Sequence, residues 1–234
     1  MTAKMRKALH AAWLFGVTGL LMILYLPLLL LPRAAMRGGL KLWAVLMVFG
    51  MRWIGGVRLE IRGTERLPPG AYLIAAKHQS WFDIVSPFLY APDALFVMKK
   101  ELGQIPAFGW LSRKAGMIEV DREAHAKALM AMLADARRLM AEPRQLLIFP
   151  EGSRSPPGAA TSYKPGVAAL YRELDLPCVP VATNSGVFLD PRGVALRPGV
   201  VVVEILEPLP PGLKRGEFMR LLQDRIDAAS AALL

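Results

Sequence analysis

The feature that most constrains this chain is an uncharged, apolar run of 21 residues, from 11 to 31, near its amino terminus. At about 1.5 Å of rise per residue, a helix of this length can cross a hydrocarbon layer of roughly 30 Å. The run has no polar face, so it does not fit a water-soluble surface helix. A cleaved signal peptide is the alternative, but its apolar core is usually only about 7–15 residues long, and here Arg33 follows closely. We therefore expect a helical membrane anchor.

A second apolar stretch, residues 42–51, follows after a basic segment. It is too short to cross a bilayer. Its apolar side chains, among them Trp43, Met47 and Met51, recur at helical spacing. This pattern predicts an amphipathic helix at the membrane interface, and an ordinary core helix is the alternative.

Positive charge is concentrated around these apolar segments. The formal net charge of the chain is +10, and residues 1–59 contain eight Lys or Arg residues but no Asp or Glu. Basic residues that flank apolar runs suit an anionic membrane surface better than a nucleic acid, so we expect membrane lipids and no nucleic acid as partners.

The orientation of the anchor does not follow from charge, because three basic residues lie on each side of the first run. Such a balance fits a re-entrant hairpin with both ends on one face, and Pro27 would help to kink it. We predict a monotopic or single-span anchor at the cell inner membrane, with the bulk of the chain on the cytoplasmic face.

From residue 56 onward, short β-rich runs alternate with helical stretches, and Pro-Gly turns separate them. The expected strands are 57–62, 72–76, 95–98, 116–119, 145–149, 179–183 and 200–206. The expected helices are 81–90, 107–114, 125–140, 167–173 and 217–233. This alternation predicts an α/β fold with a mostly parallel central sheet flanked by helices. We divide the chain into N-terminal membrane-anchoring helices, residues 1–55, and an α/β domain, residues 56–234.

The first candidate site follows the expected strand 72–76. His78 lies at the carboxyl end of this strand, where ligands gather in α/β folds, and Asp83 lies five positions later. A strand end and the first turn of a helix can bring the two together, so that the carboxylate holds one imidazole nitrogen while the other takes a proton. Alternatively, Ser80 and Asp83 form a capping box and His78 is a loop histidine. Ser80 is less suited to be a nucleophile, because serine more often caps a helix.

The second candidate site is the loop Phe-Pro-Glu-Gly-Ser-Arg-Ser at residues 149–155, which also follows an apolar strand. Glu151 supplies a carboxylate, Gly152 an adaptable backbone and Arg154 a fork-shaped cation. Such a loop suits a phosphate group, and a solvated turn is the alternative.

The third candidate is Lys99 and Lys100, which follow the expected strand 95–98 and could add positive charge for an anionic head group. A solvated helix start is the alternative. The apolar segment Val-Pro-Val at 179–181 is expected to be a core strand with its proline at the beginning.

The remaining cysteine and histidine residues do not indicate a disulfide or a zinc site. Cys178 is the only cysteine, so no intrachain disulfide can form, and we expect it to be a small buried hydrophobe. One cysteine and three histidines leave little for a zinc cluster. Neither the Gly-x-Gly-x-x-Gly pattern nor the P-loop pattern is present, so nucleotide binding has no support. His10 and His125 are expected to be bystanders.

The order of these segments along the chain is more specific to one protein family than any single segment is. The order is His-x4-Asp at 78–83, Lys-Lys-Glu-Leu at 99–102, the loop 149–155 and Val-Pro-Val at 179–181. This order resembles the glycerolipid acyltransferase family, which includes 1-acylglycerol-3-phosphate acyltransferases. The segment Ile-Glu-Val-Asp-Arg at 118–122 is similar to a further element of that family. The resemblance covers about residues 57–206 and the hydrophobic N-terminal helices.

The resemblance implies roles for individual residues. His78 matches the general base that takes a proton from the acceptor hydroxyl, and Asp83 matches the carboxylate that orients it. The positions that match binding of the acceptor's glycerol phosphate are Glu151, Gly152, Arg154 and a lysine of the second block, Lys99 or else Lys100.

The implied reaction is a direct attack of the acceptor hydroxyl on an acyl thioester, which needs no nucleophile from the protein. The donor is acyl-CoA or acyl carrier protein, and the acceptor is a lysophospholipid, foremost 1-acylglycerol-3-phosphate, which would give phosphatidic acid. No metal and no bound cofactor is implied. The alternatives are acylation of another lysolipid such as a lyso-ornithine lipid, and a non-catalytic module that binds anionic lipids. A serine esterase that uses Ser80 or Ser153 lacks the expected Gly-x-Ser-x-Gly elbow.

Overall fold

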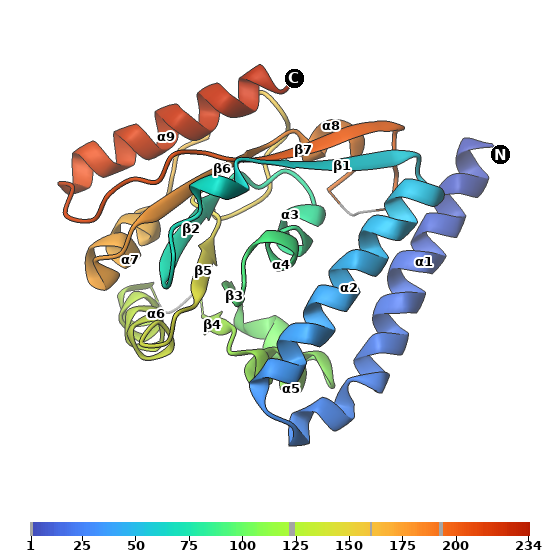
Figure 1. The fold of residues 1–234 in the computed structure, drawn as a ribbon, viewed down its shortest axis with the longest axis horizontal. Coiled ribbons are helices and arrows are strands. Elements are labelled where there is room, and N and C mark those ends of the chain that lie inside the picture. Colours follow the sequence, from blue (N-terminus) through green and yellow to red (C-terminus); the bar gives the residue numbers. More distant parts are fainter. Residues whose placement is uncertain (1, 122–124, 160, 192–193) are drawn as a thin grey trace.

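The computed structural model describes residues 2–121, 125–159, 161–191 and 194–234. A central sheet separates two groups of helices, and a hairpin of two long helices lies along one side of the molecule (Figure 1). The strands are β1 Val57–Arg62, β2 Tyr72–Ala76, β3 Ala94–Lys99, β4 Ile118–Val120, β5 Gln145–Ile148, β6 Cys178–Thr183 and β7 Gly199–Ile205. The helices are α1 Ala3–Leu24, α2 Arg33–Trp53, α3 Phe82–Val85, α4 Pro87–Tyr90, α5 Phe108–Ala115, α6 His125–Leu139, α7 Gly166–Leu174, α8 Ser185–Phe188 and α9 Arg215–Ala232.

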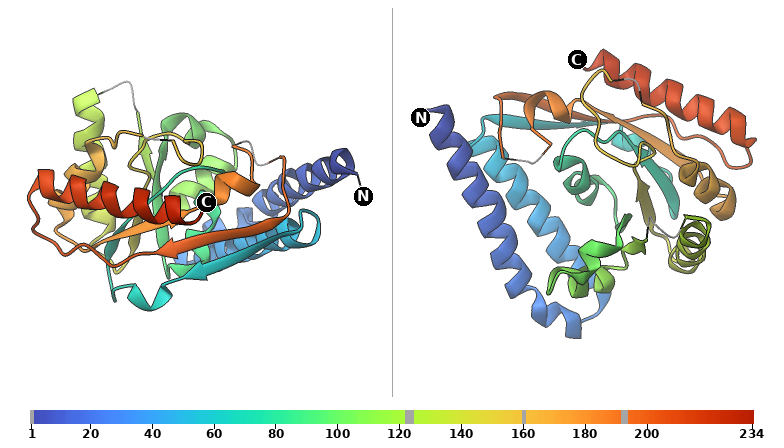
Figure 2. Two further views of the ribbon diagram at one scale, coloured as in Figure 1. Left: turned by 90° about the horizontal axis from the view of Figure 1, so that it is seen from above. Right: turned by 180° about the vertical axis from the view of Figure 1, so that it is seen from behind.

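The sheet has seven strands in the order β1-β7-β6-β2-β5-β3-β4. Neighbouring strands are parallel except for β6 and β7, so the predicted mostly parallel α/β fold is confirmed. Helices α6, α7 and α9 cover one face, and α3, α4 and α5 lie on the other, next to the hairpin (Figure 2). Because β6, β2, β5, β3 and β4 run in the same direction, their carboxyl ends meet at one edge of the sheet.

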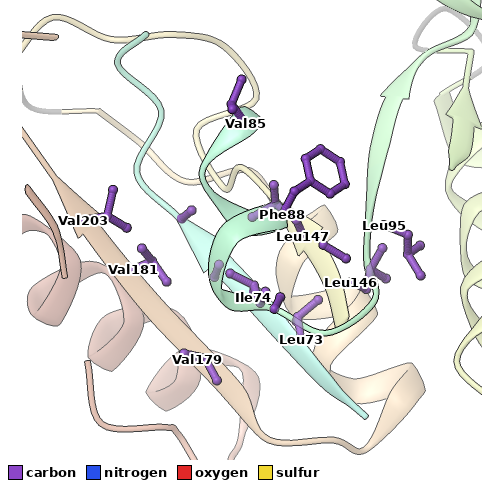
Figure 3. Packing of buried hydrophobic residues seen from close by; sticks show 14 of the residues in the cluster. Leu73, Ile74, Val85, Phe88, Leu95, Leu146, Leu147, Val179, Val181 and Val203 are labelled. Atoms are coloured by element: carbon purple, nitrogen blue, oxygen red, sulfur yellow. The ribbon is translucent and has the colours of Figure 1, made fainter. Parts of the chain in front are cut away.

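The core lies on both faces of the central strands. All five residues of β2 are buried, as expected of a parallel strand that is covered on both sides. Ile74 of β2 and Leu147 of β5 lie side by side in this core, and Val85 and Phe88 of the short helices pack near them (Figure 3). The carboxyl edge of these strands therefore adjoins a continuous buried core.

The position of Pro180 corrects the prediction for strand 179–183. Strand β6 begins one residue earlier, at Cys178, so the proline is its third residue and not its first. Pro180 has no N–H to donate, yet it sits in a central strand. The strand tolerates it because the pairing with β7 begins only at Val181, opposite Ile205.

The predicted helix 81–90 is wrong as a single helix, because the structure divides it into α3 and α4 at Ser86. Pro87 cannot donate a backbone hydrogen bond, and its ring excludes the carbonyl of Asp83, four residues earlier, from continuing the helix. Helix α3 is therefore a single turn that holds Asp83 close to the end of β2.

The N-terminal helices form an antiparallel hairpin (Figures 1 and 2). A short 3-10 helix, Leu26–Leu30, contains Pro27 and makes the turn. The Trp13 indole donates to Leu46 O at 2.9 Å, and the Tyr25 hydroxyl donates to Gly39 O at 2.7 Å. These long-range bonds hold the two helices together as one unit.

The length of α2 corrects the prediction that the second apolar stretch is too short to cross a membrane. The helix begins at Arg33, directly after Pro32, and has 21 residues. By length and composition, α1 and α2 are both long and apolar enough to cross a membrane. The basic residues in the first turns of α2 had suggested a boundary, but they lie inside the helix.

Helix α2 also contributes to the core of the α/β domain. Met36, Met47 and Met51 are almost fully buried and belong to the same apolar cluster as the sheet residues. The helix contacts β1, α4 and α5. The alternative prediction of a core helix is thus confirmed for this face, while Leu42 and Phe49 remain exposed on another.

Candidate active site

The topology brings the sequence-predicted residues to one edge. His78 follows β2, Glu151 follows β5 and Lys99 ends β3, and these three strands are neighbours that run in the same direction. Parallel strands place their carboxyl ends at the same edge, where α/β proteins bind ligands. Strand β6 also ends here, and the residues that follow it reach the same place.

His78 and Asp83 are in contact. The Nδ1 atom of His78 lies 3.2 Å from Oδ2 of Asp83. The same oxygen accepts the backbone N–H groups of Gln79 at 2.6 Å and Ser80 at 2.7 Å, and Ser80 Oγ accepts the N–H of Phe82 at 3.2 Å. Asp83 therefore reaches back to the N–H of Ser80, as the capping-box alternative predicted, while it also contacts His78, but the N-cap of α3 is Trp81 and not Ser80.

The loop after β5 holds His78 from the other side. The imidazole is stacked on the ring of Phe149, with centroids 3.9 Å apart. The N–H of His78 donates to Oε1 of Glu151 at 2.9 Å, and the N–H of Ser155 donates to the carbonyl of His78 at 2.8 Å. Since Nδ1 faces Asp83, Nε2 is the ring nitrogen that can accept a proton from a substrate.

Glu151 connects the two loops. Its side chain is buried, and Oε2 accepts hydrogen bonds from the hydroxyls of Ser155 and of Thr161, the latter at 3.1 Å. The ammonium of Lys77 lies 3.7 Å from the same oxygen and 3.0 Å from Oδ1 of Asp227 on α9. Both carboxylate oxygens of Glu151 are thus bonded to protein groups. Lys77 and Asp227 are site residues that sequence reasoning missed.

Arg154 lies on the same loop but faces solvent. Its side chain is exposed, and Nη1 donates to the carbonyl of Pro191 at 2.7 Å. Gly152 adopts φ +75°, a conformation that favours glycine, and a Cβ there would come within 3.3 Å of Lys164 Cγ. The loop therefore places a cation at the rim of the site, next to the segment that holds His78.

The two lysines at the end of β3 differ in their surroundings. Both are exposed, and Lys100 pairs with Asp121 at 3.2 Å. Within the described parts of the chain, Lys99 makes no ion pair. Arg122, the last residue of the predicted 118–122 element, lies outside the described residues.

The remaining candidates have no direct part in this geometry. His10 is buried on α1, with its ring 6.2 Å from that of Trp81. Cys178 is fully buried, as predicted, and this burial raises the pKa of its thiol. The side chain of His125 lies outside the described residues. Among the residues that the structure describes, no group of three His, Cys, Asp or Glu residues could hold a metal ion.

The serine nucleophile also lacks support. The hydroxyl of Ser80 donates to Ser185 Oγ at 2.9 Å, and Ser153 is exposed on its loop. In the described part of the molecule, no serine hydroxyl forms a hydrogen bond with the ring of His78. An α/β domain with an imidazole held by a carboxylate, and with no serine hydroxyl bonded to that ring among the described residues, can deprotonate a substrate hydroxyl.

Comparisons with known proteins agree with this class. The model of the acyltransferase family matches residues 58–184. The 1-acyl-sn-glycerol-3-phosphate acyltransferase of Pseudomonas aeruginosa is 31% identical over 173 residues, which cover 74% of this chain and 67% of that protein. The human 1-acyl-sn-glycerol-3-phosphate acyltransferase alpha is 28% identical over 211 residues, or 87% of this chain and 74% of that protein.

The fold comparison covers almost the whole chain. The crystal structure of the 1-acyl-sn-glycerophosphate acyltransferase PlsC from Thermotoga maritima matches with a TM-score of 0.81 over 99% of this chain and 97% of that chain, at 21% identity. It has the same fold. The chain belongs to the acyltransferase family, and the resemblance predicted from its motifs is confirmed.

Proposed function

We propose that this acyltransferase moves a fatty acyl group from a thioester to the sn-2 hydroxyl of 1-acylglycerol-3-phosphate and so makes phosphatidic acid. The observation that carries the proposal is the 3.2 Å contact of His78 Nδ1 with Asp83, which leaves Nε2 for a substrate hydroxyl. The similarity to the 1-acyl-sn-glycerol-3-phosphate acyltransferases of Pseudomonas and human supports this acceptor. The test is formation of phosphatidic acid by the purified protein, with acyl-CoA and acyl carrier protein as donors in separate assays.

The proposed chemistry needs one base. His78 Nε2 accepts the proton of the acceptor hydroxyl while its oxygen attacks the thioester carbonyl. The ester C–O bond forms, the C–S bond breaks, and the leaving thiolate takes the proton from the imidazolium. Asp83 stabilises the imidazolium through Oδ2. Because the acceptor itself is the nucleophile, no acyl-enzyme intermediate forms.

An apolar cavity of about 280 Å³ suits the acyl chain of a substrate. Trp81 and Ile84, which flank Asp83 in the sequence, line this cavity together with Leu21 and Met36 of the hairpin. The cavity therefore lies between α3, the helix that carries Asp83, and the N-terminal hairpin. A fatty chain that occupies it would contact both units.

We assign the phosphate of the acceptor to Arg154, and Gly152 shapes the loop that presents it, because the N–H of Gly152 already donates to Phe149 O at 3.0 Å. A guanidinium has five N–H donors, so the bond of Arg154 to Pro191 leaves others for a phosphate. Lys99 is the better second contact, because Lys100 is already paired with Asp121. In this proposal Glu151 supports the loop, since both of its oxygens are already bonded.

Arg154→Ala is expected to raise the KM for 1-acylglycerol-3-phosphate by roughly 10- to 100-fold, the effect of losing a hydrogen bond to a charged group. The KM for a phosphate-free acceptor such as a monoacylglycerol should change by less than about twofold. Initial rates with both acceptors measure this difference, and Arg138→Ala, an exposed arginine on α6, is the matched control. Equal losses on both acceptors, or a wild-type preference for a lyso-ornithine lipid, would contradict the assignment of the acceptor.

We propose that residues 1–55 anchor the α/β domain, residues 56–234, as a monotopic unit on the cytoplasmic face of the inner membrane. Helix α2 contacts β1, α4 and α5, and Arg33 at its start is paired with Asp93 of the domain at 2.5 Å. If the hairpin crossed the bilayer, these polar contacts would have to enter the hydrocarbon layer, at high cost. A hairpin that lies in the interface keeps them in water.

The double variant Phe15→Asp/Ile23→Asp is expected to weaken binding to anionic vesicles by at least about tenfold per residue. Phe15 and Ile23 are 61% and 65% exposed on α1, and burial of such a side chain is worth roughly 1.5–3 kcal/mol. Co-sedimentation with phosphatidylglycerol-containing vesicles measures the effect. Met130→Asp is the control, because Met130 is 67% exposed on α6, away from the hairpin. Equal binding of the double variant and the wild type would exclude this membrane face.

A further inference from the structure

The structure assigns a positioning role to Ser185, the first residue of α8, which lies one position beyond the segment matched by the family model. The hydroxyl of Ser185 fixes the carboxylate of Asp83 in the orientation that holds His78. This inference rests on the proposed catalytic pair and adds a third residue that acts through Asp83 and does not touch the substrate.

Asp83 uses its two oxygens for different partners. Oδ2 faces His78 Nδ1 and accepts the backbone N–H groups of Gln79 and Ser80. Oδ1 accepts the hydroxyl of Ser185 at 2.6 Å. Asp83 is almost fully buried, and Ser185 is fully buried. A carboxylate bonded through one oxygen can turn about its Cβ–Cγ bond, and a bond to the second oxygen fixes its plane.

The direction of this hydrogen bond follows from its neighbours. An ionised carboxylate can only accept, so the proton between Ser185 and Asp83 belongs to the serine hydroxyl. The hydroxyl of Ser80 donates in turn to Ser185 Oγ at 2.9 Å. The result is a short chain of hydrogen bonds from Ser80 through Ser185 to Asp83, in which each bond polarises the next.

The backbone around Ser185 is held in place by groups from two strands, β6 and β7, and from the loop after β2 that contains Gln79. Its N–H donates to Thr183 Oγ1 at 3.1 Å, and this hydroxyl donates to Val202 O on β7. The next N–H, of Gly186, donates to Oε1 of Gln79 at 3.0 Å. A Cβ at Gly186 would come within 2.9 Å of Gln79 Cβ, so α8 lies directly against the loop between β2 and α3. Because the backbone of Ser185 is fixed, its hydroxyl can hold the carboxylate of Asp83 in one orientation.

Ser185→Ala is expected to lower kcat by about 10- to 100-fold, the factor that loss of one hydrogen bond to a charged group produces. The KM values for acyl-CoA and for the acceptor should stay within about twofold, because Ser185 does not reach the substrate. In an Asp83→Asn background, the same substitution should lower kcat by less than about twofold, since the group that Ser185 orients is no longer a carboxylate.

The assay is release of free thiol from acyl-CoA with whichever lysolipid the wild type uses best. If that acceptor is not 1-acylglycerol-3-phosphate, the proposed function is wrong, but the kcat of Ser185→Ala can still be compared with that of the wild type. Ser230→Ala is the matched control, because it also removes a buried serine hydroxyl, one that has no hydrogen-bond partner in the described structure. It should retain the wild-type kcat.

A second measurement does not depend on turnover. The imidazole N–H proton resonance of His78, recorded by NMR of ¹⁵N-histidine-labelled protein, should shift in Ser185→Ala and stay in place in Ser230→Ala. The inference is overturned by a Ser185→Ala protein with the wild-type kcat, by an equal loss in the Asp83→Asn background, or by an unchanged His78 resonance.

Discussion

His78→Ala is expected to lower the rate of acyl transfer by about 10²–10⁴-fold, which is the usual contribution of a positioned general base. The imidazole is the group at the sheet edge that is oriented by a carboxylate and has a ring nitrogen left for the acceptor hydroxyl. Without it, water must take the proton during attack on the thioester. The measurement is the steady-state rate of phosphatidic acid formation, together with the fraction of protein bound to vesicles.

The controls separate loss of the base from loss of the fold. His78→Ala should bind vesicles like the wild type, because the hairpin does not depend on the imidazole. His125→Ala, at the start of α6, should keep full activity. If purified His78→Ala retained even half of the wild-type turnover, direct base catalysis by this residue would be excluded.

The fold was predictable from the sequence where the apolar pattern is local. All seven expected strands are present, and their boundaries agree within one residue except at the start of β4, because continuous buried runs such as Tyr72–Ala76 are bounded by turn residues. The wrong helix boundaries arise where a single residue decides where a helix begins or ends. Pro87 ends a helix that the apolar spacing alone would continue, and Pro32 starts α2 well before its apolar part.

Helix α8 was not expected, since four residues carry no periodic signal. Its existence depends on hydrogen bonds with distant residues. Ser185 bonds to Asp83, 102 positions earlier, and Lys77 pairs with Asp227, 150 positions later. Such pairs leave no trace in local spacing, so one sequence does not reveal them.

The His–Asp pair was predictable for the opposite reason. Its members are five positions apart, and the strand end and helix turn between them are both visible in the sequence. Asp83 also accepts the N–H of Ser80 before α3, so the contact that shapes the turn also sets the distance to His78. The structural contact and the proposed functional contact of this carboxylate are therefore compatible.

Asp93→Ala is expected to lower the free energy of unfolding by about 3–5 kcal/mol, the cost of leaving a buried charge without its partner. Asp93 lies 2.5 Å from Arg33 of the hairpin and 3.4 Å from the fully buried Arg144. Burial lowers the pKa of the Arg144 guanidinium, and the carboxylate of Asp93 opposes this shift. Urea denaturation of the full chain in mild detergent measures the loss.

The exposed partner of the same arginine provides the matched control. Glu142 also pairs with Arg33, but its side chain is 63% exposed, so Glu142→Ala should cost less than about 1 kcal/mol. The double variant Asp93→Ala/Arg144→Met should recover much of the stability, because it removes the buried cation together with its partner. If Asp93→Ala and Glu142→Ala had equal effects, the buried pair of Asp93 with Arg144 would not be the source of the loss. A loss confined to Asp93, and relieved by removing Arg144, would show that the unpaired buried guanidinium causes it, whereas a loss that persists without Arg144 would point to the contact of Asp93 with Arg33 of the hairpin.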